Sequence, residues 1–167
     1  MLFFASSIHD FDLARWLMQD EVSQVQAYMT VAIRPEVEQH GDIVAGVVNL
    51  KYDHGAIGNV ESYAQCLYGY DVRTEIIGSK GSVLVGGLRQ TPAIFLKTEG
   101  GSCDLADHFL TRFADAYLAE MRDFVDNMLN DRAPRVTGTD GLRAVEIAVA
   151  AQRSCLNSVA CAVDKSA

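Results

Sequence analysis

The spacing of apolar residues changes twice along the chain, and the first change falls near residue 20. Apolar side chains recur at helical spacing from Ile8 to Leu17, which predicts a helix that ends near Asp20. We expect Ser6 or Ser7 to cap this helix, because a serine hydroxyl can accept hydrogen bonds from the backbone amides of a first turn. The chain is therefore expected to open with a short helix.

A strand period replaces the helical one between residues 24 and 33, where apolar positions alternate with polar ones: Val25, Ala27, Met29, Val31 and Ile33. After a polar loop at 34–41, further strands are predicted at 43–52, 56–65, 72–78, 83–85 and 92–96, the last being short. Tight turns join them, among them Asp53-His54-Gly55 and the segment 79–82. Consecutive strands joined in this way pair in antiparallel fashion, so parallel βαβ units are not expected.

The helical period then returns in two long segments. The first carries one apolar stripe that we expect to pack as core against the sheet, and it ends at Pro134: Phe109, Phe113, Tyr117, Met121, Phe124, Val125 and Met128. A capping box formed by Thr137 and Asp140 is predicted to start the second, which carries Leu142, Val145, Ala148, Val149, Gln152 and Leu156. The predicted class is α+β, an open, mostly antiparallel sheet with helices packed on one face, in a single domain over 1–167.

The charge and composition of the chain limit the classes of partner that it is expected to bind. The 167 residues carry 22 acidic and 14 basic side chains, a net charge of −8, so nucleic acid and anionic membrane surfaces are unfavourable partners. We find neither a signal peptide nor an apolar run of about 18 residues, and we expect a cytoplasmic protein with four free cysteine thiols. The mean hydropathy of +0.07 suggests apolar surface that meets a subunit or another domain.

Candidate chemistry is sparse. The glycine pairs do not have the spacing of a dinucleotide-binding turn, and no metal-ligand spacing is present. His9 and Asp12 lie three residues apart on the predicted first helix, where they can line one cleft, although spacing alone favours a surface histidine beside helix-capping acids. Tyr68 and Tyr70 flank a glycine and can border a polyol pocket, or can simply pack as the aromatic start of a strand.

Four segments in order resemble motifs of the Gfo/Idh/MocA oxidoreductases, most closely the inositol 2-dehydrogenases. Residues 8–17 resemble the family's H-x-x-D helix, and residues 68–78 its Y-G-Y-D strand entry. Residues 113–124 resemble its helix of pattern F-x-x-A-Y-x-x-E-x-x-x-F, and 137–144 its T-G-x-D-G-L-x-A helix start. The resemblance runs in register from about residue 4 to about residue 160.

This resemblance implies a nicotinamide-dependent dehydrogenase of about twice this length. An N-terminal Rossmann domain would hold NAD or NADP and supply a lysine, and the C-terminal domain would bind a polyol or sugar and form a dimer or tetramer through its open sheet face. The chain resembles only that C-terminal domain. The histidine that exchanges the substrate proton falls on His9, the H-x-x-D aspartate near the substrate on Asp12, and the tyrosine that borders the pocket on Tyr70.

Two departures from the family pattern limit the expected activity. Inositol dehydrogenases usually carry an aspartate four residues before the histidine, and here that residue is Ala5. The lysine and the nucleotide domain are also missing, so we expect this chain alone to bind no cofactor and to be inactive. The alternative is a truncated, non-catalytic oligomerisation or polyol-binding module. We place the surplus apolar surface on an open sheet face built by strands such as 25–33, and where a nucleotide domain would sit.

Overall fold

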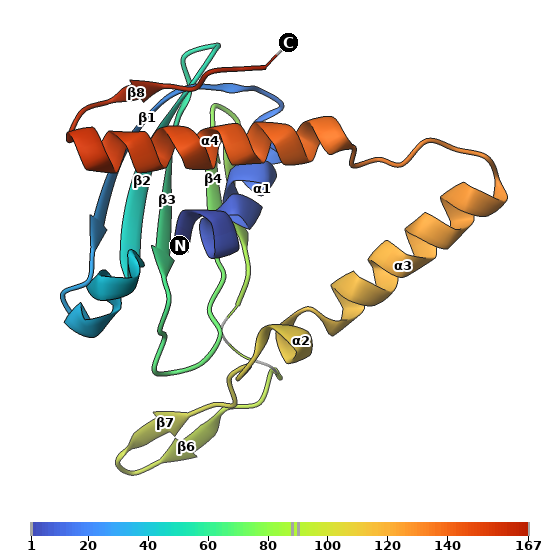
Figure 1. Ribbon diagram of the computed structural model, residues 1–167. Helices are drawn as coiled ribbons and strands as arrows, with labels where there is room; N and C mark the ends of the chain where they lie inside the picture. Colours follow the sequence, from blue (N-terminus) through green and yellow to red (C-terminus); the bar gives the residue numbers. More distant parts are fainter. Residues whose placement is uncertain (1, 88, 90, 167) are drawn as a thin grey trace. The chain divides into compact units, whose positions relative to one another are not determined.

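A computed structural model describes residues 2–87, 89 and 91–166 (Figure 1). The chain divides into two compact units. The first, here called the sheet unit, comprises Met1–Gln65 and Arg135–Ala167, and the second, the hairpin unit, comprises Cys66–Pro134. In the part of the chain that is described, no helix has both the length and the apolar content that a membrane span needs.

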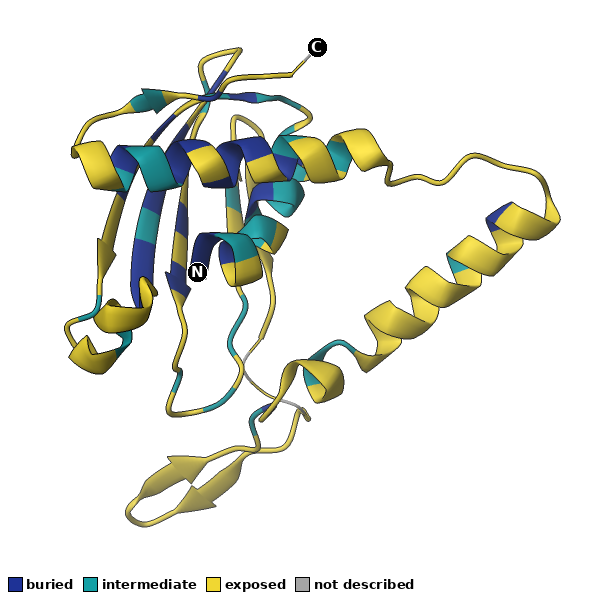
Figure 2. Ribbon diagram, in the orientation of Figure 1, coloured by how far each residue is buried: buried dark blue, intermediate teal, exposed yellow. Residues whose placement is uncertain are grey.

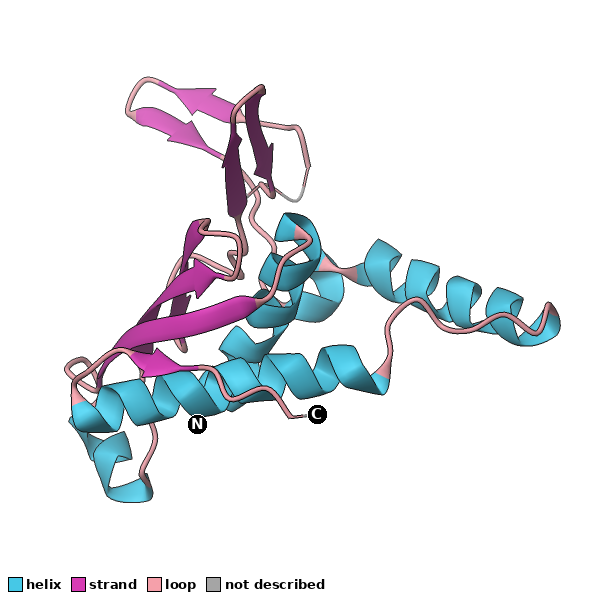
Figure 3. Ribbon diagram, turned by 90° about the horizontal axis from the view of Figure 1, so that it is seen from above, coloured by secondary structure: helices cyan, strands magenta, loops and turns pink. Residues whose placement is uncertain are grey.

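The sheet unit contains a four-stranded antiparallel sheet with helices on one face (Figure 3). Its strand order is β3-β2-β1-β8, with β1 at Val22–Thr30, β2 at Ala45–Tyr52, β3 at Ile57–Tyr63 and β8 at Cys161–Ala162. The helices are the π-helical turn η1 (Phe3–Ser7), α1 (Ile8–Met18) and α4 (Gly138–Asn157), and the 3-10 helix η2 (Pro35–His40) occupies the predicted polar loop. This arrangement confirms the predicted α+β class.

The alternating pattern correctly predicts which side chains form the apolar face of β1. It does not predict that this face lies beneath the helices. Val25 and Ala27 are buried opposite Leu50 and Val48 of β2, beneath the helices, whereas Ile33 lies beyond the strand and is 65% exposed. The apolar side of β1 is therefore not on the open sheet face, and that expectation is wrong. The open face, so named from here on, instead carries mostly polar and aromatic side chains: Gln24, Gln26, Tyr28, Val47, Asn49, Lys51, Ile57, Asn59, Glu61 and Tyr63.

Helix α4 packs on the sheet through small side chains. The buried residues of its inner face include Ala144, Ile147, Ala148, Ala150 and Ala151 (Figure 2). Most of the large apolar residues that mark this helix in the sequence lie on its outer face, where Leu142, Val145, Val149 and Leu156 are exposed. A row of alanines, which hydropathy gives little weight, instead lets the helix approach the sheet closely.

The two long helices of the sheet unit begin differently. Thr137 and Asp140 form the predicted capping box of α4, since the Asp140 carboxylate accepts from the Thr137 amide at 2.7 Å and from its hydroxyl at 2.8 Å. Neither Ser6 nor Ser7 caps α1, which continues directly from η1. Ser7 already has helical backbone angles, and its buried hydroxyl donates to Ser62 of β3 at 2.8 Å. The buried residues Leu2 and Phe3 extend the helical segment past the predicted cap.

The hairpin unit consists of two hairpins followed by helices. β4 (Thr74–Gly78) pairs with β5 (Gly81–Val85), and β6 (Phe95–Lys97) pairs with β7 (Gly100–Ser102). Gly100 and Gly101 lie in β7, where Gly100 has φ of 133°. The strand predicted at 92–96 is thus the first arm of a hairpin, and it is not the last strand of the chain.

The long helix predicted after residue 109 is split at Phe113 into α2 (Phe109–Arg112) and α3 (Ala114–Leu129). The helical spacing of its apolar stripe predicted α3 correctly. The stripe itself is exposed, with Tyr117 at 41%, Phe124 at 55% and Met128 at 68% (Figure 2). The stripe is therefore not part of a core within the hairpin unit, because periodicity identifies an apolar face without identifying what covers it.

We expect Ser154→Ala to lower the free energy of unfolding by about 1–3 kcal/mol. The buried Ser154 hydroxyl accepts from the Ala27 amide of β1 at 3.0 Å and donates to the Val159 carbonyl at 2.5 Å. The Ala27 amide lies beyond the end of the β1–β8 pairing, whose last pair is Cys161 with Val25. Removing the Ser154 hydroxyl therefore leaves this amide as an unpaired donor. Urea unfolding measures the change. Thr139→Ala, at an exposed position of α4, is the control and should have little effect; equal losses in the two variants would contradict the assignment.

Candidate functional site

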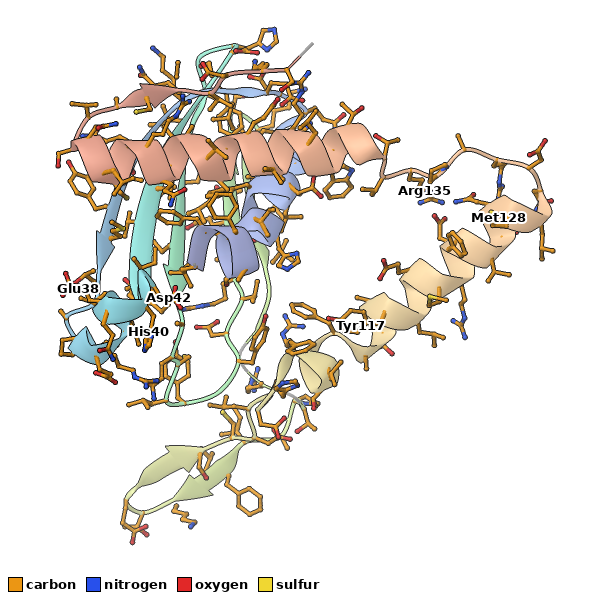
Figure 4. The ribbon with its side chains drawn as sticks, viewed as in Figure 1. Glu38, His40, Asp42, Tyr117, Met128 and Arg135 are labelled. Carbon is orange, nitrogen blue, oxygen red and sulfur yellow. The ribbon has the colours of Figure 1, made fainter. Side chains whose placement is uncertain are left out.

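A pocket of about 530 Å³ lies in the sheet unit, between α1 and the segment that leads into α4. Figure 4 marks Arg135 in that segment. The lining comes from three parts of the chain: α1, the residues that connect it to β1, and the start of α4. The lining residues are His9, Asp12, Leu13, Arg15, Trp16, Gln19, Asp20, Glu21, Arg135, Val136 and Asp140. Because all of them belong to one compact unit, the packing of that unit alone shapes the pocket.

The structure brings His9 and Asp12 to the same pocket, since they lie one helical turn apart on the exposed face of α1. They do not form a hydrogen bond with each other. Among the described residues His9 has no hydrogen-bond partner, and Asp12 bonds to Arg15 instead. The neighbouring Asp10 is partly buried, which raises the pKa of its carboxyl, and His9 partly offsets that effect. The imidazole is thus available to a bound molecule.

Arg15 lies at the centre of a charge cluster behind this pair. Its side chain is only 9% exposed, and its guanidinium forms a two-pronged contact with Glu21, at 2.8 Å from Nε and 2.6 Å from Nη2. Its Nη1 lies 3.2 Å from Oδ1 of Asp12, 3.4 Å from the carbonyl of Asp140 and 3.8 Å from the Oδ1 of Asp140. One buried cation therefore joins three carboxylates from three segments of the unit.

The hydrogen bonds in this cluster favour the ionised carboxylates. The bond from Arg15 lowers the pKa of Glu21 more than partial burial raises it. The bonds from Thr137 lower the pKa of Asp140. The pocket wall is thus acidic and ionised near neutral pH, and it presents acceptor oxygens to hydroxyl donors.

Asp20 lines the same pocket but is committed to the turn between β2 and β3. Its carboxylate accepts from the amide of His54 at 3.0 Å and from the amide of Glu21 at 2.9 Å, and its Oδ1 lies 2.7 Å from Nδ1 of His54. Burial alone would raise the pKa of Asp20, but these contacts lower it overall. Asp20 therefore contributes charge to the pocket while its oxygens remain occupied.

Tyr70 belongs to the hairpin unit, where its ring packs in an aromatic cluster. The Tyr70 ring lies edge-on to Phe113, with centroids 5.9 Å apart, and 6.2 Å from Phe109. Its amide donates to the Ala106 carbonyl at 2.7 Å. Within this unit, the contacts fit the aromatic-packing interpretation of the Y-G-Y-D segment, and the ring is 37% exposed. A role for Tyr70 at the substrate remains a prediction.

Tyr68 and Asp71 complete the Y-G-Y-D segment. The Tyr68 hydroxyl donates to Asp71 at 2.8 Å, and Asp71 also pairs with Arg73 at 2.9 Å. Hydrogen bonds with Cys66 and then with Asp71 raise the pKa of Tyr68 well above its usual range. Both side chains are therefore engaged inside the hairpin unit.

Ala5 lies in η1, one turn before His9, and is exposed. Its methyl group can neither accept a hydrogen bond nor carry charge. The carboxyls nearest to His9 in sequence, Asp10 and Asp12, are therefore the remaining candidates to act with the imidazole.

The other histidines and the cysteines add no second site. His40 in η2, beside Glu38 and Asp42 (Figure 4), His54 and His108 are all exposed. The four cysteines are free thiols, as predicted. Over residues 2–87, 89 and 91–166, no group of three or more histidine, cysteine or acidic side chains is placed to hold a metal ion.

The sequence predicts that His9 and Asp12 share one face of a helix, which the structure shows, but it did not point to the charge cluster around Arg15. Asp12 and Arg15 are opposite charges three residues apart on a helix, a signal that could have been used. Glu21 follows α1 closely in sequence, but its return to Arg15 depends on the chain turning into β1. Asp140 is 125 residues from Arg15, and only tertiary packing brings them together.

Comparisons with known proteins identify the family to which the chain belongs. A family model described as the C-terminal alpha/beta domain of an oxidoreductase family, named GFO_IDH_MocA_C, matches residues 1–163. The chain is 35% identical over 163 residues to a scyllo-inositol 2-dehydrogenase (NAD(+)) from Bacillus subtilis, covering 98% of this chain and 48% of that protein. It is 37% identical over 155 residues to a myo-inositol 2-dehydrogenase from Thermotoga maritima, covering 92% of this chain and 46% of that protein.

A solved structure also matches nearly the whole chain. The crystal structure of a scyllo-inositol dehydrogenase from Lactobacillus casei, with bound NAD(H) and scyllo-inositol, matches with a TM-score of 0.92 and 28% identity. The match covers 97% of this chain and 48% of that one. The chain therefore spans about half the length of the curated relatives it matches.

We expect the stability contributed by Glu21 to be lost in acid. Its pKa is lower in the folded chain than in the unfolded chain, so the unfolded chain binds more protons as the pH falls below about 4.3. The stabilisation is complete above that pH and disappears as the pH drops through the lower, folded pKa. The difference in unfolding free energy between wild type and Glu21→Gln, measured in urea, should therefore shrink on acidification.

The control for this experiment is Glu38→Gln in η2, which lies in the same unit and outside the open face. Glu38 is exposed, and the described residues give its carboxylate no hydrogen bond or ion pair. Its difference from wild type should stay small at every pH. A Glu21→Gln difference that grows on acidification would contradict a lowered pKa of Glu21 in the folded chain.

Proposed function

Because the chain belongs to the Gfo/Idh/MocA oxidoreductase family, we propose that it is the substrate-binding and oligomerisation domain of an NAD(P)-dependent inositol or sugar 2-dehydrogenase. The observation that carries the proposal is the pocket in which His9 and Asp12 meet on α1. The matched relatives are named for inositol oxidation, and the chain aligns with one half of each. The proposal treats residues 1–167 as one domain, with its two units as parts of the same substrate-binding half.

In the proposed chemistry, His9 accepts the proton of the substrate hydroxyl that is oxidised. Its imidazole lines the pocket and has no competing hydrogen bond among the described residues. Asp12 accepts a hydrogen bond from a neighbouring ring hydroxyl and thereby fixes the orientation of the ring in the pocket. Tyr70 is proposed to border the bound ring, as the family motif implies.

The residues of this chain do not fit a dinucleotide. A pyrophosphate cradle needs a glycine turn between a strand and a helix, whereas Gly78 pairs with Gly81 in the β4–β5 hairpin. Gly100 and Gly101 pair with Lys97 and Leu96 in the β6–β7 hairpin. Among the described residues, no glycine lines the pocket. We therefore assign no hydride step to this chain, and the proton transfer at His9 requires a nicotinamide held elsewhere.

A second candidate function is a non-catalytic polyol-binding or oligomerisation module. The observation that favours it is Ala5, which places a methyl group where inositol dehydrogenases usually carry an aspartate one turn before the histidine. Such a module would use the same pocket for binding, without proton exchange.

We expect the purified 167-residue chain to form no NADH from NAD and myo-inositol or scyllo-inositol. The physical reason is the lack of a dinucleotide cradle and of a carboxylate at Ala5. Absorbance of NADH measures the reaction, with the Thermotoga maritima relative as the positive control. Robust NADH formation that disappears in His9→Asn would overturn the expected inactivity.

Oligomerisation is proposed to occur through the open face. Its side chains are mainly amides and tyrosines, and some are already paired along the sheet: Gln26 donates to Tyr28 at 3.0 Å, and Asn59 donates to Asn49 at 2.8 Å. Tyr28 and Tyr63 are 61% and 58% exposed. A mostly uncharged surface that carries exposed tyrosines suits contact between copies of the chain, because little charge has to be desolvated.

We expect the chain to be a dimer or tetramer at micromolar concentration, measured by light scattering after gel filtration. Tyr28→Arg should shift it toward the monomer, since the interface would bury a new charge. Thr139→Arg, an exposed substitution on α4, is the matched control and should leave the mass unchanged. A wild-type monomer at this concentration would contradict the interface.

A further inference from the structure

We propose that Arg15 is the positioning residue of the polyol site: it holds Asp12 by one carboxylate oxygen so that the other oxygen is free to accept a substrate hydroxyl. The inference deepens the proposed function and rests on it. Arg15 is not required to touch the substrate, because its effect passes through Asp12.

The geometry that supports this role starts with Glu21. The two-pronged contact uses Nε and Nη2 of Arg15, which fixes the plane of the guanidinium. With those two nitrogens engaged, Nη1 is the one directed at Asp12 and Asp140. Arg15 thus reaches Asp12 from a fixed direction.

Asp12 is held on one side only. Nη1 of Arg15 lies 3.2 Å from Oδ1 of Asp12, and among the described residues no group donates to its Oδ2. The Asp12 side chain is 39% exposed and lines the pocket, whereas that of Arg15 is 9% exposed. A carboxylate anchored by one oxygen loses rotational freedom, and its second oxygen becomes a fixed acceptor.

The anchor is also tied to the far wall of the pocket. Asp140, which Arg15 contacts, closes the capping box with Thr137 at the start of α4. Arg15 therefore couples the position of Asp12 on α1 to the first turn of α4. A lysine could supply the charge, but its single ammonium cannot reproduce the planar fork that spans Glu21 and Asp12.

The cluster is also more acidic than an ion-pair network needs to be. Four carboxylates line the pocket (Asp12, Asp20, Glu21 and Asp140) against two guanidinium groups (Arg15 and Arg135). A role confined to stability would be served by the pair with Glu21 alone. The contact with Asp12 instead orders an acceptor at the pocket surface, which suits a neutral, hydroxyl-rich ligand.

The first arm of the test needs no ligand. In the 167-residue chain, nuclear magnetic resonance of the Arg15 guanidinium should give separate Nη signals, because the fork is held. Asp12→Asn should move the Nη1 signal and leave Nε, which bonds to Glu21, nearly unchanged. An Arg15 spectrum that Asp12→Asn does not alter would overturn the proposal.

The second arm is a double-mutant cycle on myo-inositol affinity, followed through amide shifts near His9. We expect Arg15→Lys and Asp12→Asn each to weaken binding about tenfold. The double variant should bind as weakly as Asp12→Asn alone, because Arg15 acts through Asp12. If the two losses multiply in the double variant, Arg15 acts by another route and the proposal fails.

Arg143→Lys is the matched control, because it alters a similar pair in the same unit, Arg143 with the buried Glu146 at 2.9 Å, outside the pocket lining. It should lower the melting temperature and leave the affinity for myo-inositol unchanged. If Arg143→Lys weakened binding as much as Arg15→Lys does, the effect of Arg15 would be general destabilisation. A wild-type chain that keeps the Arg15–Asp12 contact but binds no myo-inositol overturns the proposed function, and the positioning role with it. Inositol binding without that contact overturns the Arg15 proposal alone.

Discussion

The alanine face of α4 against β1 and β2 is the contact from which the site follows. Ala148 and Ala151 are fully buried, and they belong to one core with Val25, Val48 and Phe11 of α1. Small side chains hold the helix close to the sheet, where the Ser154 hydroxyl can reach the Ala27 amide. This contact also sets where α4 begins, and with it the position of Asp140 opposite α1.

The pocket is a consequence of that placement. Arg15 faces Asp140 because α1 and α4 cover the same side of the sheet, and Glu21 returns to Arg15 because the chain must turn from α1 into β1. A buried guanidinium without partners would be costly, and Glu21, Asp12 and Asp140 supply them here. The acidic wall beside His9 is therefore formed by the packing of α1 and α4 on the sheet.

In the proposed function, the chain supplies one side of a redox reaction. His9 can take a proton and Asp12 can orient a hydroxyl, but the described residues have no cradle for a dinucleotide. Within its own unit, the apolar stripe of α3 is left uncovered. The apolar residues behind the slightly positive mean hydropathy therefore lie on the outer stripes of α3 and α4 more than on the open face.

The sequence by itself determined the class, most strand positions, the capping box at Thr137 and Asp140, and the pair His9 and Asp12, because each depends on local periodicity or on motifs within a few residues. Only the tertiary structure decided which faces are covered: the alanines of α4 instead of its leucine and valines, and the inner side of β1 instead of the open face. It also decided the partners of Arg15, since Glu21 and Asp140 meet it only after the chain folds back. Periodicity reports that a face is apolar or charged, whereas burial and ion pairing depend on residues far away in the chain.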